Sequence, residues 1–187
     1  GPIIPTPGAV MECTKLLYEY LGDLIVLDVG GATTDLHSVT VESDQVARLM
    51  ISPEPKAKRT VEGDLGVYVN RWKVVESIGE ELREQCREQG FSMEHALETY
   101  RAIPKTEEEV KLVELLTREA VVKAAERHAG RLRYIYGPSG RSTVAEGKDL
   151  TQVKYIVGTG GALTRLPHRE EIMREITRCN ESGMLLL

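Results

Sequence analysis

The chain has 187 residues, of which 41% are hydrophobic and 28% charged, which favours a globular domain with one hydrophobic core. Its formal net charge of −5 argues against nucleic acid or an anionic membrane surface as the main partner. The sequence contains no run of 18 apolar residues, so no membrane span is expected. Cys13, Cys86 and Cys179 are too far apart for a disulfide framework or a zinc or iron–sulfur spacing, so a reducing cytoplasm is the expected location.

The first third of the chain predicts a helix and an antiparallel meander. Residues 9–21 are expected to form a helix after a proline-containing lead-in. The apolar run 24–28 predicts a buried strand. Two further strands are predicted at 35–41 and 46–52, and Pro53 is expected to end this three-strand meander.

The middle of the chain is predicted to be mainly helical. Apolar residues recur every three or four positions over 68–86, which predicts one helix that Gly90 stops. A short helix is expected over 92–100. A T-x-x-E capping box at Thr106 predicts the start of a long helix that ends near residue 129.

The last third contains turns, one strand and one helix. Glycine and proline over 134–148 predict turns and a short hairpin. A strand is expected at 155–157 and a helix at 168–178.

The segment that follows the first predicted strand carries residues suited to phosphate chemistry. Gly30 and Gly31 let the backbone approach a phosphate closely, and successive N–H groups in such a turn bind anions. Asp28 and Asp35 would hold Mg²⁺, usually through its waters, or orient an attacking water. Taken alone, the segment is explained equally well as a tight β-hairpin.

A second glycine-rich loop follows the strand near the end of the chain. Its sequence from Gly158 to Ala162 is GTGGA, and a helix start comes directly after it. One such loop is weak evidence, but two in this order, separated by a helical stretch, favour a nucleotide site.

Three segments of the chain carry a resemblance to a known family. They are DVGGATTDLHSV at 28–39, PEPKAKRTVEGDLG at 53–66 and GTGGALTRLP at 158–167. Together they resemble the accessory, or reactivating, protein family of the adenosylcobalamin-dependent glutamate (methylaspartate) mutase, which is part of the actin-like ATPase superfamily. Ala32 stands where the heat-shock chaperones of that superfamily have a third glycine, so its φ is expected to be negative.

The resemblance implies an α/β fold of the ribonuclease H-like, actin-like ATPase type, with a mixed sheet, an antiparallel three-strand meander and flanking helices. In that superfamily the nucleotide lies between two lobes, and the first lobe opens with a D-x-G-[ST] motif that this sequence lacks. Residues 1–187 are therefore expected to be the C-terminal lobe, with 53–105 a mostly helical insert and the N-terminal lobe absent.

The resemblance also assigns roles to individual residues. Three residues are expected to act on the attacking water and the γ-phosphate, namely Asp28, Thr33 and Asp35. The two carboxylates among them are expected to hold Mg²⁺, mostly through water. The residues whose backbone is expected to lie against the phosphates are Gly30, Gly31 and Ala32. The residues expected to pass along the adenosine are Gly158, Gly160, Gly161 and Ala162.

Charged residues outside the loops have two explanations each. Lys123, Glu126 and Arg127 lie on the predicted long helix and would flank the adenine, but a solvated charged face explains them equally well. Asp64, with Glu62, could reach the outer shell of the metal, and N-capping of the next helix by Asp64 is the preferred alternative.

The function implied by the resemblance is that of an ATP-dependent, chaperone-like reactivating factor. ATP and Mg²⁺ would be its cofactors, a mutase protein its partner, and ATP hydrolysis would occur only in the intact two-lobed protein. The partner surface is expected within 53–105, and direct cobalamin binding is not expected because the D-x-H-x-x-G cobalt-ligand motif is missing. The alternatives are a non-catalytic actin-like scaffold and a sugar-kinase-like phosphotransferase.

Overall fold

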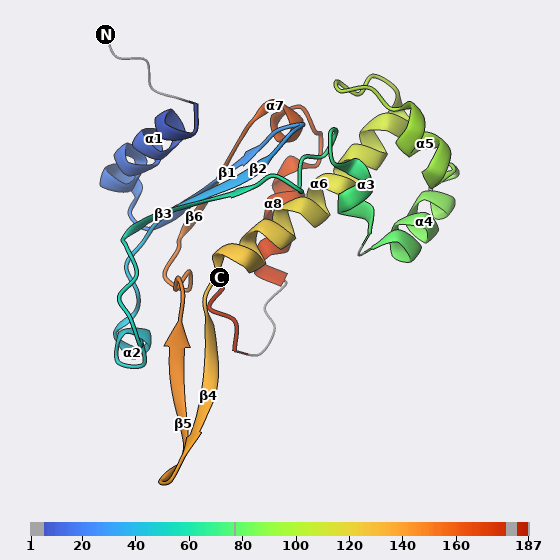
Figure 1. Ribbon diagram of the computed structural model, residues 1–187. Helices are drawn as coiled ribbons and strands as arrows, with labels where there is room; N and C mark the ends of the chain where they lie inside the picture. Colours follow the sequence, from blue (N-terminus) through green and yellow to red (C-terminus); the bar gives the residue numbers. More distant parts are fainter. Residues whose placement is uncertain (1–5, 77, 179–182, 187) are drawn as a thin grey trace.

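The chain is built around a four-stranded mixed sheet. A computed structural model describes residues 6–76, 78–178 and 183–186 (Figure 1). The strands lie in the order β3 (Ala57–Glu62), β2 (Thr34–Val39), β1 (Leu24–Val29), β6 (Tyr155–Thr159). The first three pair antiparallel, and β6 runs parallel to β1. The predicted α/β class, mixed sheet and three-strand meander are confirmed.

Both faces of β1 are buried because helices cover each side of the sheet. Ile25, Leu27 and Val29 alternate into the main core. Leu24 and Val26 point the other way, into a smaller core beneath α1 (Thr6–Leu21). The fully apolar sequence of the strand reflects this burial on two sides.

The prediction of a third strand over 46–52 is wrong. Ser43 caps a short helix, α2 (Asp44–Ala47), with its Oγ accepting a hydrogen bond from the Val46 amide at 3.2 Å. The third strand of the meander is β3, which follows the two prolines instead of preceding them. The segment 53–105, predicted as a mostly helical insert, therefore contributes a strand to the sheet before its helices begin.

Three short helices follow β3. They are α3 (Arg71–Val75), α4 (Gly79–Glu88) and α5 (Met93–Thr99). The single helix predicted over 68–86 is thus interrupted, because α3 ends at Val75 and α4 begins only at Gly79. Gly90 ends α4 with a φ of 87°, as predicted.

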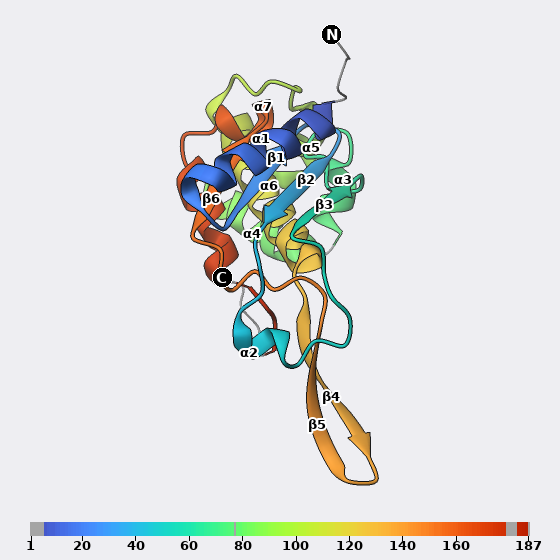
Figure 2. The ribbon, with the colours of Figure 1, turned by 90° about the vertical axis from the view of Figure 1, so that its left-hand side faces the viewer.

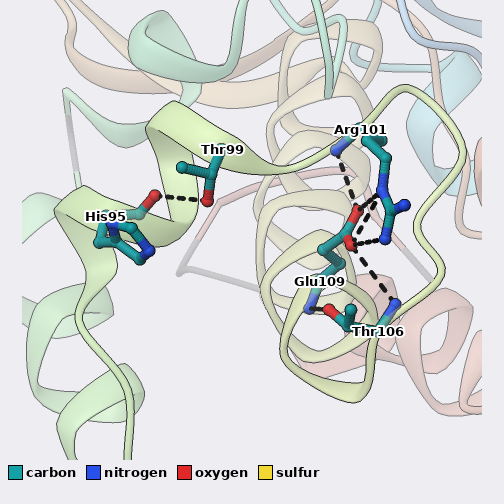
Figure 3. Close-up of polar contacts among 5 residues, drawn as sticks. All are labelled: His95, Thr99, Arg101, Thr106 and Glu109. Atoms are coloured by element: carbon teal, nitrogen blue, oxygen red, sulfur yellow. Dashed lines mark hydrogen bonds and ion pairs between the residues drawn. The ribbon is translucent and has the colours of Figure 1, made fainter.

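The long helix α6 (Glu107–His128) begins at the predicted capping box (Figure 3). The Thr106 hydroxyl accepts from the Glu109 amide at 3.2 Å, and the Glu109 carboxylate accepts from the Thr106 amide at 3.4 Å. Arg101 also donates to Glu109, at 2.5 Å, and this hydrogen bond lowers the pKa of Glu109 to about 2. The loop before α6 is therefore fastened to the first turn of the helix.

His128 joins the end of α6 to the sheet. Its Nε2 lies 2.7 Å from the Ser38 hydroxyl on β2, and its Nδ1 lies 2.8 Å from the Thr60 hydroxyl on β3. The imidazole is fully buried, and this burial lowers its pKa to about 3. A neutral ring, with one nitrogen donating and the other accepting, satisfies both hydroxyls.

The rest of the chain adds a hairpin and two small helices. Strands β4 (Arg131–Gly137) and β5 (Gly140–Glu146) form the predicted hairpin, which extends away from the sheet and helices (Figures 1 and 2). After β6 come α7 (Gly161–Thr164) and α8 (Arg169–Arg174), the latter continued by the 3-10 helix η1 (Glu175–Arg178). The described helices include none with the length and apolar character needed to cross a bilayer.

Lys148 fastens the connection between β2 and β3. It is 1% exposed, and its Nζ donates to the carbonyl oxygens of Thr40, Pro55 and Lys56 at 2.8, 2.6 and 3.0 Å. Three acceptors match the three donors of a lysine ammonium group, so the buried charge is satisfied by hydrogen bonds.

Candidate functional site

The two glycine loops lie at the same end of the sheet. Strands β1 and β6 are parallel, with Asp28 opposite Thr159, so both strands deliver their following loops to one edge, beside α7 (Figure 1). At Gly160, where φ is 90°, a Cβ would lie 2.3 Å from the Val29 carbonyl oxygen and 2.7 Å from Asp28 Oδ1. The second loop thus passes in contact with the first carboxylate.

Asp28 and Asp35 face each other across the β1–β2 pair. They are direct cross-strand partners, which places their Cβ atoms about 5 Å apart. Burial, and then the charge of Asp35, raise the pKa of Asp28. Asp35 is 4% exposed, and its Oδ1 has no hydrogen-bond partner within the described part of the chain. A buried carboxylate oxygen without a donor is the kind of group that a cation or its bound water satisfies.

The donors around this pair fit Mg²⁺ rather than a transition metal. Within residues 6–76, 78–178 and 183–186, no group of three or more histidine, cysteine, aspartate and glutamate side chains converges on one point. Mg²⁺ is usually held by one or two carboxylates with several waters and substrate phosphates. Two facing carboxylates supply that set without further protein ligands.

The first loop is supported by the chain segment that follows β3. The Gly31 carbonyl accepts from the amides of Tyr68 and Val69 at 3.1 and 2.8 Å. A Cβ on Gly66 would lie 2.3 Å from the carbonyl carbon and oxygen of Ala32. The family-like block that ends at Gly66 is therefore in direct contact with the candidate phosphate loop.

The two threonines of the loop point in different directions, as their alternation predicts. Thr34 is fully buried and donates to the Leu65 carbonyl at 2.7 Å, whereas Thr33 is only half-buried. The Gly30 amide donates to the Thr33 carbonyl at 2.9 Å and so closes the turn. No described residue other than glycine has a positive φ, so Ala32 meets the expectation for its backbone.

Each glycine of the second loop makes a different contact. Gly160 approaches β1, and its carbonyl accepts from the Thr164 amide at 3.0 Å. A Cβ on Gly158 would lie 2.7 Å from Met173 Sδ on α8, so this glycine lets the helix pack on the strand. The guanidinium of Arg165 lies over Gly161, 3.0 Å from the position that a Cβ would take there. A ligand passing Gly161 would therefore meet a positive charge. Ala162 packs against the main core.

Charged residues on α6 that were predicted to flank the adenine are engaged with the protein. Arg127 donates to Glu62 at 2.9 Å and to both oxygens of Asp64 at 2.7 and 3.0 Å, which lowers the pKa of Asp64. Lys123 pairs with Glu119 at 3.5 Å. Glu126 also has an interaction within the chain.

The prediction that Asp64 caps a helix is wrong. Asn70 precedes α3, and Asp64 is held by Arg127 from a different element. This ion pair leaves no local signal in the sequence, because the two residues are 63 positions apart.

Sequence reasoning missed a hollow between α6 and α8. His168 Nδ1 lies 3.0 Å from Glu114, whose hydrogen bond raises the pKa of the imidazole. Arg118 lines the same hollow, and its buried Nε has no hydrogen-bond partner among the described residues. The i, i+4 spacing of Glu114 and Arg118 is visible in the sequence, but their proximity to His168 depends on the fold.

His37 was also not assigned to the site from the sequence. It lies two residues after Asp35 on β2, on the same face of the sheet, and is fully buried. Neither ring nitrogen has a hydrogen-bond partner in the described part of the protein, and burial lowers its pKa. A neutral imidazole therefore adjoins the carboxylate pair.

Comparisons with known proteins agree with the resemblance seen in the sequence. A family model described as "MutL protein" matches residues 1–187. The "Protein MutL" of Clostridium tetanomorphum is 37% identical over 93% of this chain. The chain spans 40% of the length of that relative.

Proposed function

The chain belongs to the MutL protein family, and from this we propose that it is the nucleotide-binding half of an ATP-dependent accessory factor. The factor would reactivate an adenosylcobalamin-dependent mutase such as glutamate mutase. The observation that carries the proposal is the meeting of two glycine loops around the Asp28–Asp35 pair. Because the chain spans 40% of its relative, the complete activity would belong to the longer protein.

In this proposal the chain is the C-terminal lobe of an actin-like ATPase. The order β3-β2-β1-β6, with an antiparallel meander and one parallel strand, supports that assignment. The nucleotide of such a protein lies between two lobes, so the rest of the longer protein would supply the other half of the phosphate contacts.

The carboxylates and the first loop would act on the phosphates. Mg²⁺ bound there would supply the positive charge that phosphoryl transfer needs. Asp28, the more exposed carboxylate, would orient the attacking water, while the buried Asp35 would accept a hydrogen bond from a metal-bound water. Thr33 would donate its hydroxyl to a phosphate, because Thr34 already donates to Leu65.

The second loop would pass along the adenosine, with the base directed toward the hollow between α6 and α8. Gly160 is half-buried and Gly161 is exposed on this path, and Arg165 lies beside it. Arg118 Nε has no hydrogen-bond partner among the described residues, whereas Arg127 is paired with two carboxylates. Arg118, Glu114 and His168 therefore replace Lys123, Glu126 and Arg127 as the proposed neighbours of the base.

ATP would act on the mutase through the arrangement of the lobes. A ligand shifts a conformational equilibrium only by its different affinity for the two states, so ATP and ADP would have to favour different lobe arrangements. Damaged cobalamin would leave the mutase during this change. This chain would not bind the released cobalamin itself, since it lacks the cobalt-ligand motif.

The test uses the intact protein and a mutase inactivated by turnover. Recovery of mutase activity is expected with ATP, Mg²⁺ and fresh adenosylcobalamin, and no recovery with a non-hydrolysable ATP analogue. Equal recovery with the analogue would contradict the ATPase step. ATP-dependent filaments without any recovery would favour the scaffold instead.

A further inference from the structure

The β4–β5 hairpin is an arm with almost no cover from the other described residues of the chain. All seven residues of β4 are exposed, and most of β5 is exposed or half-exposed. Figures 1 and 2, at right angles to each other, both show the arm extending beyond the body of the molecule. Seven residues per strand give a reach of about 23 Å at the usual rise of a strand.

One face of the arm carries a stripe of large side chains. Leu132, Tyr134 and Tyr136 alternate onto it, with exposed fractions that rise toward the tip from 37% to 54% and 76%. Arg141, which pairs with Tyr136 across the hairpin, places its guanidinium 4.2 Å from the Tyr134 ring centroid. Tyrosine and arginine are the residue types most enriched at the energetic centres of protein interfaces.

The root of the arm is fastened to the body, although its tip is not. The Leu132 amide donates to the Gly183 carbonyl at 2.6 Å, and Ala145 exchanges hydrogen bonds with Leu49 and Ile51 on the other edge. At the base a Cβ on Gly130 would lie 2.4 Å from the Glu146 carbonyl oxygen, so the two strands are pressed together there. The stripe is thus held out in a fixed direction.

The exposure of the arm is unfavourable in isolation. A two-stranded hairpin alone in water is marginally stable, because neither face is packed. Exposed aromatic side chains add to the apolar area that a partner would remove from water. A surface that covers this face of the arm would therefore stabilise it.

The charge of the arm indicates what kind of surface it fits. Residues 131–146 contain three arginines and one glutamate, a formal +2, on a chain whose net charge is −5. Arg133 is paired with that glutamate, at 2.5 Å. A protein surface with an apolar patch bordered by carboxylates would complement both the tyrosines and the positive charge.

We propose that the β4–β5 arm is the docking element for the mutase, which would receive the Leu132–Tyr134–Tyr136 face in an apolar patch bordered by acidic residues. This inference rests on the proposed function and replaces the expectation of a partner surface within 53–105. Part of that segment forms β3, which pairs with β2, and Gly66 packs against the phosphate loop. These parts of the segment are therefore already in contact with the rest of the domain.

The test measures binding of the intact protein to glutamate mutase by titration calorimetry. The double variant Tyr134→Ser, Tyr136→Ser is expected to bind at least about tenfold more weakly, as for a truncated interface centre, with its basal ATP hydrolysis unchanged. Arg141→Glu is expected to weaken binding and to reduce the dependence of the affinity on salt concentration. Tyr20→Ser is the matched control, because Tyr20 is 87% exposed on α1, on a different element.

The outcomes distinguish failure of the docking proposal from failure of the proposed reactivating function. Unchanged affinity in the double variant, or equal weakening by Tyr20→Ser, would overturn the arm while leaving the accessory role in place. Wild-type binding that the double variant loses, without ATP-dependent reactivation, would support the arm and reject the reactivase. If sedimentation shows that the variants instead disrupt a dimer of this protein, or if the arm binds only lipid vesicles or nucleic acid, mutase docking is wrong.

Discussion

The two glycine loops occupy the same end of the sheet but are stabilised in different ways. The first loop has ordinary backbone angles and is supported from outside, by hydrogen bonds to Gly31 and by the close approach of Gly66. The second depends on one residue, Gly160, whose φ of 90° and contact with Val29 admit no side chain. Similar sequences, GGA in both loops, therefore carry different structural constraints.

The two loops therefore allow effects on folding stability to be distinguished from effects on the chemistry of the site. At Gly160 a substitution acts first on the backbone contact with Val29 and also crowds the Asp28 carboxylate. At Asp28 a substitution acts on charge, with little effect on packing. Four experiments test this separation, in order of decreasing expected effect.

The largest effect is expected from Gly160→Ala. Its Cβ would lie 2.3 Å from a backbone oxygen and the residue would keep a positive φ, so a destabilisation of about 3 kcal/mol or more is expected. Urea unfolding of the chain measures it. Gly30→Ala is the control, because its nearest contact is 3.5 Å and it should cost less than about 1 kcal/mol. Equal losses at both positions would remove the distinction between the loops.

The next effect concerns hydrolysis. In the intact protein Asp28→Asn is expected to lower ATP turnover on the order of a hundredfold, about 2.7 kcal/mol, because the group that orients the water loses its charge. Steady-state phosphate release measures it. Asp64→Asn, whose carboxylate is held by Arg127, should stay within about threefold of wild type. An unchanged rate in the Asp28 variant would exclude that residue from the mechanism.

The two threonines should give opposite results. Thr34→Val removes the buried donor to the Leu65 carbonyl and is expected to cost about 1–2 kcal/mol of stability. Thr33→Val should change stability by less than about 0.5 kcal/mol, as at other partly exposed positions, and lower ATP turnover instead. Urea unfolding and turnover are measured for both variants. The reverse pattern would mean that Thr34 faces the phosphates.

The smallest effect is a dependence of stability on pH. The pKa of Asp28 is raised in the folded chain, so its charge opposes folding, and stability falls as pH rises through the raised value. Asp28→Asn should therefore be more stable than wild type near pH 7, by on the order of 0.5 kcal/mol for a partly solvated pair. At pH 3 the two should be equal. A variant less stable than wild type at neutral pH would contradict the repulsion between the two carboxylates.

Local signals in the sequence predicted much of the fold. The capping box at Thr106 needs only residues three apart, and the stop at Gly90 needs only one residue with a positive φ. The strand predicted over 46–52 is wrong because the apolar residues there favoured a strand, whereas Ser43 caps a helix that begins at Asp44, and the local cap prevailed.

The candidate site was predictable where its geometry follows from neighbours in the chain. A hairpin between Asp28 and Asp35 brings the two carboxylates together, so their pairing could be expected. The contact of Gly160 with Asp28 depends on parallel pairing between strands more than a hundred residues apart, and the pairing of Arg127 with Asp64 depends on the packing of α6. Neither leaves a periodic signal in the sequence.

The position of Lys148 makes it an internal reporter of opening. Acylating reagents attack an accessible, deprotonated amine, whereas the Lys148 ammonium group is buried and donates three hydrogen bonds in the interior. Its modification therefore requires the connection between β2 and β3 to separate from the start of the segment that leads to β6. The rate at which mass spectrometry detects the label at Lys148 would measure how often the chain opens there, without any added probe.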